Sequence, residues 1–189
     1  MKRGNIKVEQ IHNGSIVLDY DHPLNKKEII NLLNNTFKSS LKIKDNIVVY
    51  SNGSGNILNI YFKNITYLGH PHPISKKRIQ VPKEYRPKLE QASTLLLGIY
   101  HYEGKLLISI FSNFDYIYKK MNNSSAHINI NDLFDCSKNG SQSRIDENKN
   151  LILVFDQYRI ESFLEKYLIQ YETESDIEEI AIWMRQNFM

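Results

Sequence analysis

The segment TLLLGIYHYEGKLLISIF, residues 94–111, decides the fold class of this chain. Two mostly apolar runs, 94–102 and 105–111, are separated only by Glu103 and Gly104. A polar residue followed by glycine favours the tight turn that joins two antiparallel strands. The segment therefore predicts a β-hairpin.

A second hairpin is predicted upstream, within residues 46–68. A strand-like run at 46–50 is followed by SNGSGN, which favours a turn, and then by a longer strand-like run at 57–68. Twelve tyrosines and eight phenylalanines also favour β-structure. Further short strands are expected around residues 15–20, 78–82, 125–130 and 151–155.

Helices are predicted to flank this β-rich part. Apolar spacing predicts a first helix at about 24–41, with Asn25 or Asp21 as its N-cap. Two more are expected at 157–171 and 176–188, the second with a capping box formed by Ser175 and Glu178. Residues 137–143 are polar and predict a mobile loop. The expected fold class is mainly β with flanking helices (α+β).

The composition fits one ordinary domain with some appended structure. No apolar run approaches the roughly 20 residues that span a membrane, and the basic N-terminus lacks the apolar region of a signal peptide. Cys136 is the single cysteine, which excludes an intrachain disulfide and favours a reducing compartment. We therefore expect a cytoplasmic protein without a membrane partner.

The net charge of +3 hides a strong asymmetry along the chain. Residues 146–189 hold ten acidic and four basic side chains, net −6, so that residues 1–145 carry net +9. Seven of the basic residues, with a single glutamate, lie between Lys63 and Lys88. A focused basic strip is typical of a polyanion-binding protein, although a solvated lysine-rich surface has the same composition.

The centre of that strip is HPHPISKKRIQVPK, residues 70–83. Its first two prolines disfavour helix and predict a stiff projection that leads into a strand. Three consecutive cations come next, suited to phosphate contacts, and a glutamine lies close behind them for base edges. The predicted base contacts are Arg78 and Gln80, the predicted phosphate contacts are Lys76, Lys77 and Lys83, and His70 and His72 are expected to assist them.

A second polar cluster precedes the strand at 125–130. Two lysines are followed by short amide and hydroxyl side chains, which read base edges or hold phosphates in many complexes, but which also form ordinary turns. We expect this cluster to act as a second DNA-contacting loop. Its predicted contacts are Lys119, Lys120, Asn122, Asn123, Ser124 and Ser125.

Catalytic motifs are sparse. Glu103 and Lys105 match half of a metal-dependent nuclease site, but no aspartate lies between Asp45 and Asp115 to complete it. The triplet at 98–100, Gly-Ile-Tyr, lacks the second triplet of the nucleases that carry it. No histidine or cysteine spacing fits zinc, and the glycines at 52–56 lack the lysine of a phosphate-binding loop. We predict no cofactor, no metal and no catalytic residue in this chain.

The two basic loops resemble those of the B-three-like pseudobarrel domains that recognise DNA in restriction endonucleases of the EcoRII and BfiI type. The resemblance rests on GHPHP at 69–73, KKRIQVP at 76–82 and NNSSAH at 122–127, and it covers about residues 45–155. It implies a small open pseudobarrel of antiparallel strands, whose two loops enter the major groove. In such systems an attached nuclease domain or a partner subunit cleaves the DNA, and LlaJI/McrBC-type systems join the recognition domain to a GTP-hydrolysing motor.

These patterns indicate three regions and leave three functions open. The regions are an N-terminal strand and helix (1–44), a DNA-recognition core (45–155) and C-terminal helices (156–189) that could link to a further domain. The preferred function is site-specific binding of double-stranded DNA, with a nuclease subunit or a C-terminal GTPase motor as possible partners. The alternatives are a small nuclease that uses Glu103 and Lys105, or a protein that docks a partner through its acidic C-terminal helices.

Overall fold

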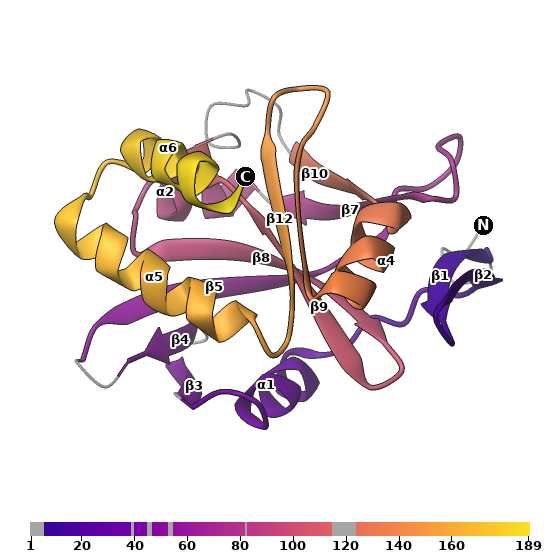
Figure 1. Ribbon diagram of the computed structural model, residues 1–189, viewed down its shortest axis with the longest axis horizontal. Coiled ribbons are helices and arrows are strands. Elements are labelled where there is room, and N and C mark those ends of the chain that lie inside the picture. The colour runs from indigo at the N-terminus through magenta and orange to yellow at the C-terminus, as the bar shows by residue number, and fades with distance from the viewer. Residues whose placement is uncertain (1–5, 39, 45–46, 53–54, 82, 115–123) are drawn as a thin grey trace.

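A seven-stranded mixed sheet forms the middle layer of the molecule (Figure 1). The computed structural model describes residues 6–38, 40–44, 47–52, 55–81, 83–114 and 124–189. Across the sheet the strand order is β11-β12-β9-β8-β5-β4-β3. In that order the strands are Ser141–Ile145, Leu151–Asp156, Lys105–Phe111, Thr94–Tyr102, Ile57–Asn64, Ile47–Ser51 and Ser40–Lys44.

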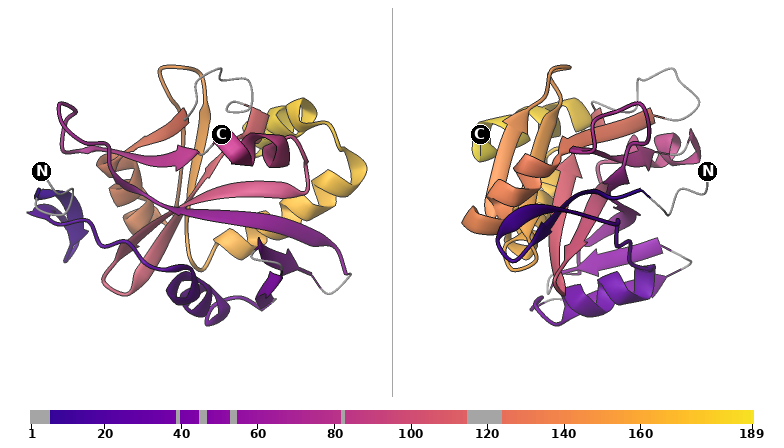
Figure 2. Two further views of the ribbon diagram at one scale, coloured as in Figure 1. Left: turned by 180° about the vertical axis from the view of Figure 1, so that it is seen from behind. Right: turned by 90° about the vertical axis from the view of Figure 1, so that its right-hand side faces the viewer.

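Two smaller sheets accompany the large one. One has the order β10-β7-β6, with strands Ser124–Asn129, Lys76–Val81 and Thr66–Tyr67, and the other is the hairpin of β1 (Val8–His12) and β2 (Ser15–Asp19). The left-hand view in Figure 2 shows β7 and β10 on the other side of the molecule from the C-terminal helices. This three-stranded sheet holds six of the predicted DNA contacts, namely Lys76, Lys77, Arg78, Gln80, Ser124 and Ser125.

The two faces of the large sheet bury different partners. Helices α1 (Lys26–Asn34), α5 (Ile160–Thr173) and α6 (Ile177–Phe188) contribute to one apolar cluster. Strands β1, β7 and β10 and helix α4 (Ile130–Asn139) contribute to a second cluster. Side chains alternate in direction along a strand, so β8 and β9 supply residues to both clusters.

The central hairpin is confirmed with its predicted boundaries. Strands β8 and β9 pair antiparallel, with Tyr102 opposite Lys105. The two turn residues have positive φ angles, 47° at Glu103 and 73° at Gly104. Positive φ at both positions is the geometry of a type I′ turn, which matches the twist of the strands it joins.

The expectation that the strands of the pseudobarrel are antiparallel was wrong for one pair in the large sheet, which is mixed. Strands β5 and β8 pair in parallel, from Asn59 opposite Thr94 to Asn64 opposite Ile99. A parallel pair needs a crossover connection, and residues 65–93 provide it. This crossover contains β6, β7, the 3₁₀ turn η1 (Lys83–Tyr85) and the short helix α2 (Arg86–Leu89). The large sheet is not closed into a barrel.

Two local predictions also need correction. The first helix ends at Asn34, and residues 40–44 form strand β3, so the predicted helix 24–41 was too long. Residues 137–143 are not a loop, because α4 extends to Asn139 and β11 begins at Ser141. Gly140 between them has φ 80° and ends α4 in the left-handed conformation that glycine favours.

Two helix caps were predicted, with different outcomes. Asn25 caps α1 as expected, in a reciprocal capping box with Glu28. The capping residue of α6 is Asp176, which accepts from the Glu178 backbone N–H at 2.7 Å, instead of the predicted Ser175. No helix among the described residues is both long and apolar enough to cross a membrane.

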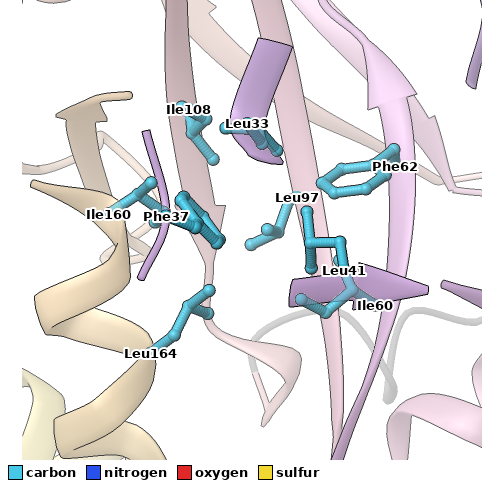
Figure 3. A pocket seen from close by; sticks show the side chains of 9 residues that line it. All are labelled: Leu33, Phe37, Leu41, Ile60, Phe62, Leu97, Ile108, Ile160 and Leu164. Carbon is cyan, nitrogen blue, oxygen red and sulfur yellow. The ribbon is translucent and has the colours of Figure 1, made fainter. Parts of the chain in front are cut away.

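The gap between α1, α5 and the sheet is part of the core (Figure 3). Nine apolar side chains line it, and it has no room for a water molecule. Because its lining lacks any polar group, it offers no specificity for a ligand. The lining residues are Leu33, Phe37, Leu41, Ile60, Phe62, Leu97, Ile108, Ile160 and Leu164.

Candidate nucleic-acid interface

Strand β7 separates its residues into a buried row and an accessible row. Lys77, Ile79 and Val81 are buried, each 0% exposed. The residues between them, Lys76, Arg78 and Gln80, are partly or fully accessible. Successive side chains point to opposite faces of a strand, so these three share the outer face. Three of the predicted contacts are therefore aligned on one surface.

Strand β10 extends this surface. It pairs antiparallel with β7, which places Ser125 opposite Gln80, and Asn129 opposite Lys76. Ala126 and Ile128 are buried, whereas the residues that alternate with them are partly accessible. The outer face of the β7–β10 pair, which we call the polar face, consists of Lys76, Arg78, Gln80, Ser125, His127 and Asn129.

Arg78 lies at the centre of the polar face. It is opposite His127 on one side and opposite Thr66 of β6 on the other. Its Nη1 donates a hydrogen bond to Ser125 Oγ over 3.2 Å. This bond holds the guanidinium group across the two strands and uses only one of its five N–H donors. The predicted residues Arg78 and Ser125 are thus brought into direct contact.

The proline-rich projection forms the turn between β6 and β7. Residues 70–74 are all exposed, including His70 and His72. The turn is held by the hydrogen bond from His72 N–H to the Gly69 carbonyl, 3.0 Å, and by that from the Tyr67 hydroxyl to the His72 carbonyl, 2.6 Å. Figure 1 shows this turn extending beyond the body of the molecule at the start of β7.

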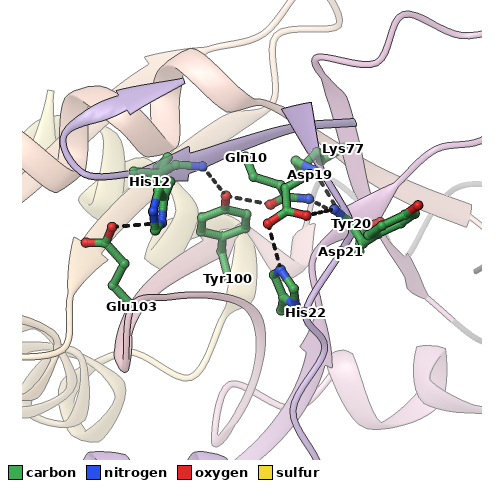
Figure 4. Close-up of polar contacts among 10 residues, drawn as sticks. Gln10, His12, Asp19, Tyr20, Asp21, His22, Lys77, Tyr100 and Glu103 are labelled. Atoms are coloured by element: carbon green, nitrogen blue, oxygen red, sulfur yellow. Dashed lines mark hydrogen bonds and ion pairs between the residues drawn. The ribbon is translucent and has the colours of Figure 1, made fainter. Parts of the chain in front are cut away.

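Lys77 does not belong to the polar face. Its ammonium group is buried and lies 3.0 Å from Asp21 Oδ1 (Figure 4). Asp21 also accepts hydrogen bonds from Gln10 Nε2 and from the Tyr67 backbone N–H, both over 2.8 Å. Burial lowers the pKa of Lys77, and the Asp21 carboxylate counteracts part of that shift. A buried, paired ammonium group cannot reach a phosphate, so we remove Lys77 from the predicted contacts.

The two ends of the polar face border different segments of the chain. The projection precedes Lys76, whereas Ser124, the first residue of β10, lies opposite Val81 at the other end. These ends are about 17 Å apart at the usual rise of a strand. Lys83, another predicted contact, is exposed in η1 directly after β7. Lys119, Lys120, Asn122 and Asn123 lie outside the described residues.

An open hollow of about 180 Å³ borders the polar face beside Lys76 and Asn129. Its far side is formed by Arg144 of β11 and by Asp146 and Glu147 of the turn between β11 and β12. Asp146 accepts from two backbone N–H groups of its own turn, those of Asn148 and Asn150, each over 2.8 Å. Acidic groups repel phosphates, so this turn marks one boundary of the surface open to a polyanion.

A family model, methylase-associated X1, matches residues 56–164, which is more than half of the chain. The chain belongs to the methylase-associated X1 family. The family's name links it to methylases, which hints at a restriction-modification context. Comparison with curated proteins and with solved structures found no match.

The residues matched by the methylase-associated X1 model include the whole polar face. They run from the start of β5 into α5, so β7, β10 and the crossover between β5 and β8 all lie inside the match. The projection at residues 69–75 is included as well. The surface that carries the predicted contacts therefore belongs to the part of the chain that defines the family.

The nuclease alternative receives little support from the same structure. The Glu103 carboxylate accepts from the Asn13 backbone N–H and lies 3.2 Å from His12 Nδ1, so it fastens the β1–β2 hairpin to the β8–β9 turn (Figure 4). Lys105 begins β9, opposite Tyr102. Among the described residues, no three His, Cys, Asp or Glu side chains gather as a metal site would require.

Three side chains of this region were not assigned a role from the sequence. Thr66, His127 and Asn129 join the surface only because β6 and β10 flank β7. The alternation SAHINI at 125–130 indicated which β10 residues share a face. The identity of the neighbouring strand could not be read from it, because strand pairing is a long-range property.

Proposed function

We propose that this domain binds double-stranded DNA at a specific sequence and serves as the target-recognition module of a restriction-modification system. The observation that carries the proposal is the row of Lys76, Arg78 and Gln80 along the outer face of β7. The family assignment supports the biological context, since its name refers to methylases.

The chemistry of this row suits both parts of DNA recognition. Arginine can donate two hydrogen bonds to guanine, and glutamine can bind adenine in the same bidentate manner. Lys76 and Lys83 would contact phosphates and set the register on the duplex. His70 and His72, exposed in the projection, would donate further hydrogen bonds to the backbone.

A two-stranded antiparallel ribbon fits into the major groove of B-DNA. We therefore place β7 and β10 in that groove, with the projection at one end. The second loop would lie at the other end and contribute Lys119, Lys120, Asn122 and Asn123, together with Ser124 and Ser125. This arrangement agrees with the two-loop plan of B-three-like pseudobarrel domains, which we retain as the proposed family relationship.

We assign no reaction to the domain itself. In this proposal residues 45–155 recognise DNA, residues 1–44 support that core, and residues 156–189 connect it to other parts of the system. Cleavage would come from a nuclease subunit or from a nuclease domain attached to this one, and a C-terminal GTPase motor that hydrolyses GTP would be a separate partner. Recognition and chemistry would then be divided between different folded units.

Selection from a randomised duplex library tests the proposal. The purified chain is incubated with the library in methylated and unmethylated forms, and bound duplexes are sequenced over several rounds. We expect one sequence to be enriched, in one methylation state or in both. Enrichment of no sequence in either form, with all duplexes bound equally, would contradict site-specific recognition.

Two lysine variants test the orientation of β7. Lys76→Ala should weaken binding to all duplexes and reduce the slope of log K against log salt by about 0.9, the value for one phosphate contact. Lys77→Met should leave that slope unchanged, because its ammonium group is buried against Asp21. Lys42→Ala, which removes an exposed lysine of β3, is the matched control.

A further inference from the structure

A compact cluster of two tyrosines and two lysines lies on β5 and on the segment after β7. Tyr61 and Tyr85 have ring centroids 4.8 Å apart. Lys63 Nζ lies 4.7 Å from the Tyr85 ring centroid, and Lys88 Nζ lies 5.3 Å from that of Tyr61 and 5.8 Å from that of Tyr85. We call these four residues the tyrosine–lysine cluster. They come from β5, η1 and α2.

The lysines of this cluster contact aromatic rings instead of acidic groups. Among the described residues, neither Lys63 nor Lys88 forms an ion pair, and both ammonium groups lie over the tyrosine rings. The negative π-face of each ring attracts the ammonium group and favours this position of the lysine side chain. Both ammonium groups lie near the Tyr85 ring, so they repel one another, and a bound polyanion that contacts both would relieve that repulsion.

The position of the cluster relates it to the polar face. Its Tyr85 lies in η1, next to the Gln80 end of β7, and Lys83 in the same turn is exposed. Figures 1 and 2 both show α2 beyond the end of β7 that is opposite the projection. A duplex lying along β7 would therefore pass the cluster after it leaves the polar face.

We infer that the tyrosine–lysine cluster is a second nucleic-acid contact, which binds the phosphodiester backbone of the duplex flanking the recognised site. The tyrosine rings hold the two ammonium groups in place, so that little side-chain entropy is lost when phosphates arrive. The cluster would not recognise a base, because a contact between lysine and phosphate carries no sequence information. This inference rests on the proposed DNA-binding function and extends its footprint.

The test compares Lys63→Ala/Lys88→Ala with the intact chain on a cognate duplex and on a random one, over a range of salt concentrations. The slope of log K against log salt should fall by about 1.8, because two phosphate contacts are lost. Affinity for both duplexes should decrease by the same factor, on the order of tenfold or more at moderate salt. Lys42→Ala/Lys166→Ala, which removes two lysines outside the cluster, should change neither quantity.

A second variant examines the role of the rings. Tyr85→Leu keeps an apolar side chain but removes the π-face beside Lys63 and Lys88. It should lower the binding affinity for both duplexes by the same factor, and by a smaller factor than the double lysine variant does. Thermal unfolding of each variant shows whether the fold is retained. An unchanged salt slope in Lys63→Ala/Lys88→Ala would overturn the inference.

The outcomes separate this inference from the proposed function. If the intact chain binds cognate and random duplexes equally, sequence-specific recognition fails, while a reduced slope in the double variant still supports the backbone contact. If the intact chain is specific but the slope does not change, only the cluster assignment fails. Absence of DNA binding by the intact chain would refute both.

Discussion

Asp21 and Lys77 join the N-terminal segment to the strand that carries the proposed DNA contacts. Lys77 Nζ donates to Asp21 Oδ1 over 3.0 Å, and the Lys77 side chain is fully buried. The same carboxylate accepts a hydrogen bond from Gln10 Nε2, and Gln10 Oε1 accepts a hydrogen bond from the Tyr100 hydroxyl over 2.7 Å. This network fixes β7 from its inner side and leaves the outer side for a partner.

The first prediction concerns the stability that this pair provides. Asp21→Ala leaves a buried ammonium group without its counter-charge, which costs roughly 3–5 kcal/mol of unfolding free energy. Urea denaturation measures the loss. Asp19→Ala is the control, since Asp19 is a half-buried aspartate two residues away, and the unfolding midpoint of this variant should stay near that of the intact chain. Equal effects of the two substitutions would contradict the structural role of Asp21.

The second prediction is a pH dependence. Burial lowers the pKa of Lys77 from 10.5, so the folded chain releases this proton at a lower pH than the unfolded chain does. Between those two pKa values the unfolded state binds more protons, and the contribution of Lys77 to stability therefore rises with pH. Buried Tyr100 and Tyr167, whose pKa values are raised, act in the opposite direction above pH 10.

Comparison with Lys77→Met isolates the contribution of the lysine. Unfolding free energies of both proteins are measured across the alkaline range up to pH 10.5. The intact chain should gain stability relative to Lys77→Met as the pH rises through that range. A constant difference between the two proteins would show that Lys77 titrates normally in the folded state.

The third prediction concerns Gly98 in β8, which Ile65 between β5 and β6 and Ile79 of β7 approach closely. A Cβ atom at this position would lie 3.0 Å from Ile65 Cγ1 and 3.1 Å from Ile79 Cγ2. Gly98→Ala should therefore destabilise the fold by about 1–3 kcal/mol through overpacking. Ile65→Ala in the same chain makes room for the new methyl group, so the double variant should lose less than the sum of the single losses. Simple additivity would argue against this contact.

The fourth prediction concerns the single cysteine. Burial raises the pKa of the Cys136 thiol to about 12, which leaves almost no thiolate at neutral pH. A thiol reagent should react very slowly with the native protein. Once urea unfolds the chain, the reagent should label one thiol per molecule. Labelling of the native protein at the rate of the unfolded chain would show that α4 does not bury this side chain as described.

Local signals predicted much of this fold. The hairpin of β8 and β9 is encoded by two apolar runs and an adjacent Glu-Gly turn, all within 18 residues, and its boundaries agree with the structure. Asn25 was identified as a cap because its chemistry is local too. Long-range features were missed: the parallel pairing of β5 with β8 depends on 29 intervening residues that form the crossover.

The candidate site was predicted in the same uneven manner. Lys76, Arg78 and Gln80 could be grouped from the sequence because they alternate with residues of the other face. Lys77 was assigned to phosphates on charge alone, although Ile79 and Val81 share its parity and are buried. The face of the strand on which a residue lies decides its burial more strongly than its own polarity does, because the row of apolar residues fixes which face is buried. Helix α4 was missed because its polar C-terminal residues have turn-forming composition.

Binding of Arg78→Ala to the selected duplex and to a random duplex tests the central claim most directly. If the outer face of β7 reads DNA, this variant should lose about 1–3 kcal/mol of binding free energy on the selected duplex and much less on the random one. Its discrimination between the two should therefore fall. Equal binding of the variant and the intact chain to both duplexes would contradict the assignment of Arg78 and of the polar face to sequence recognition.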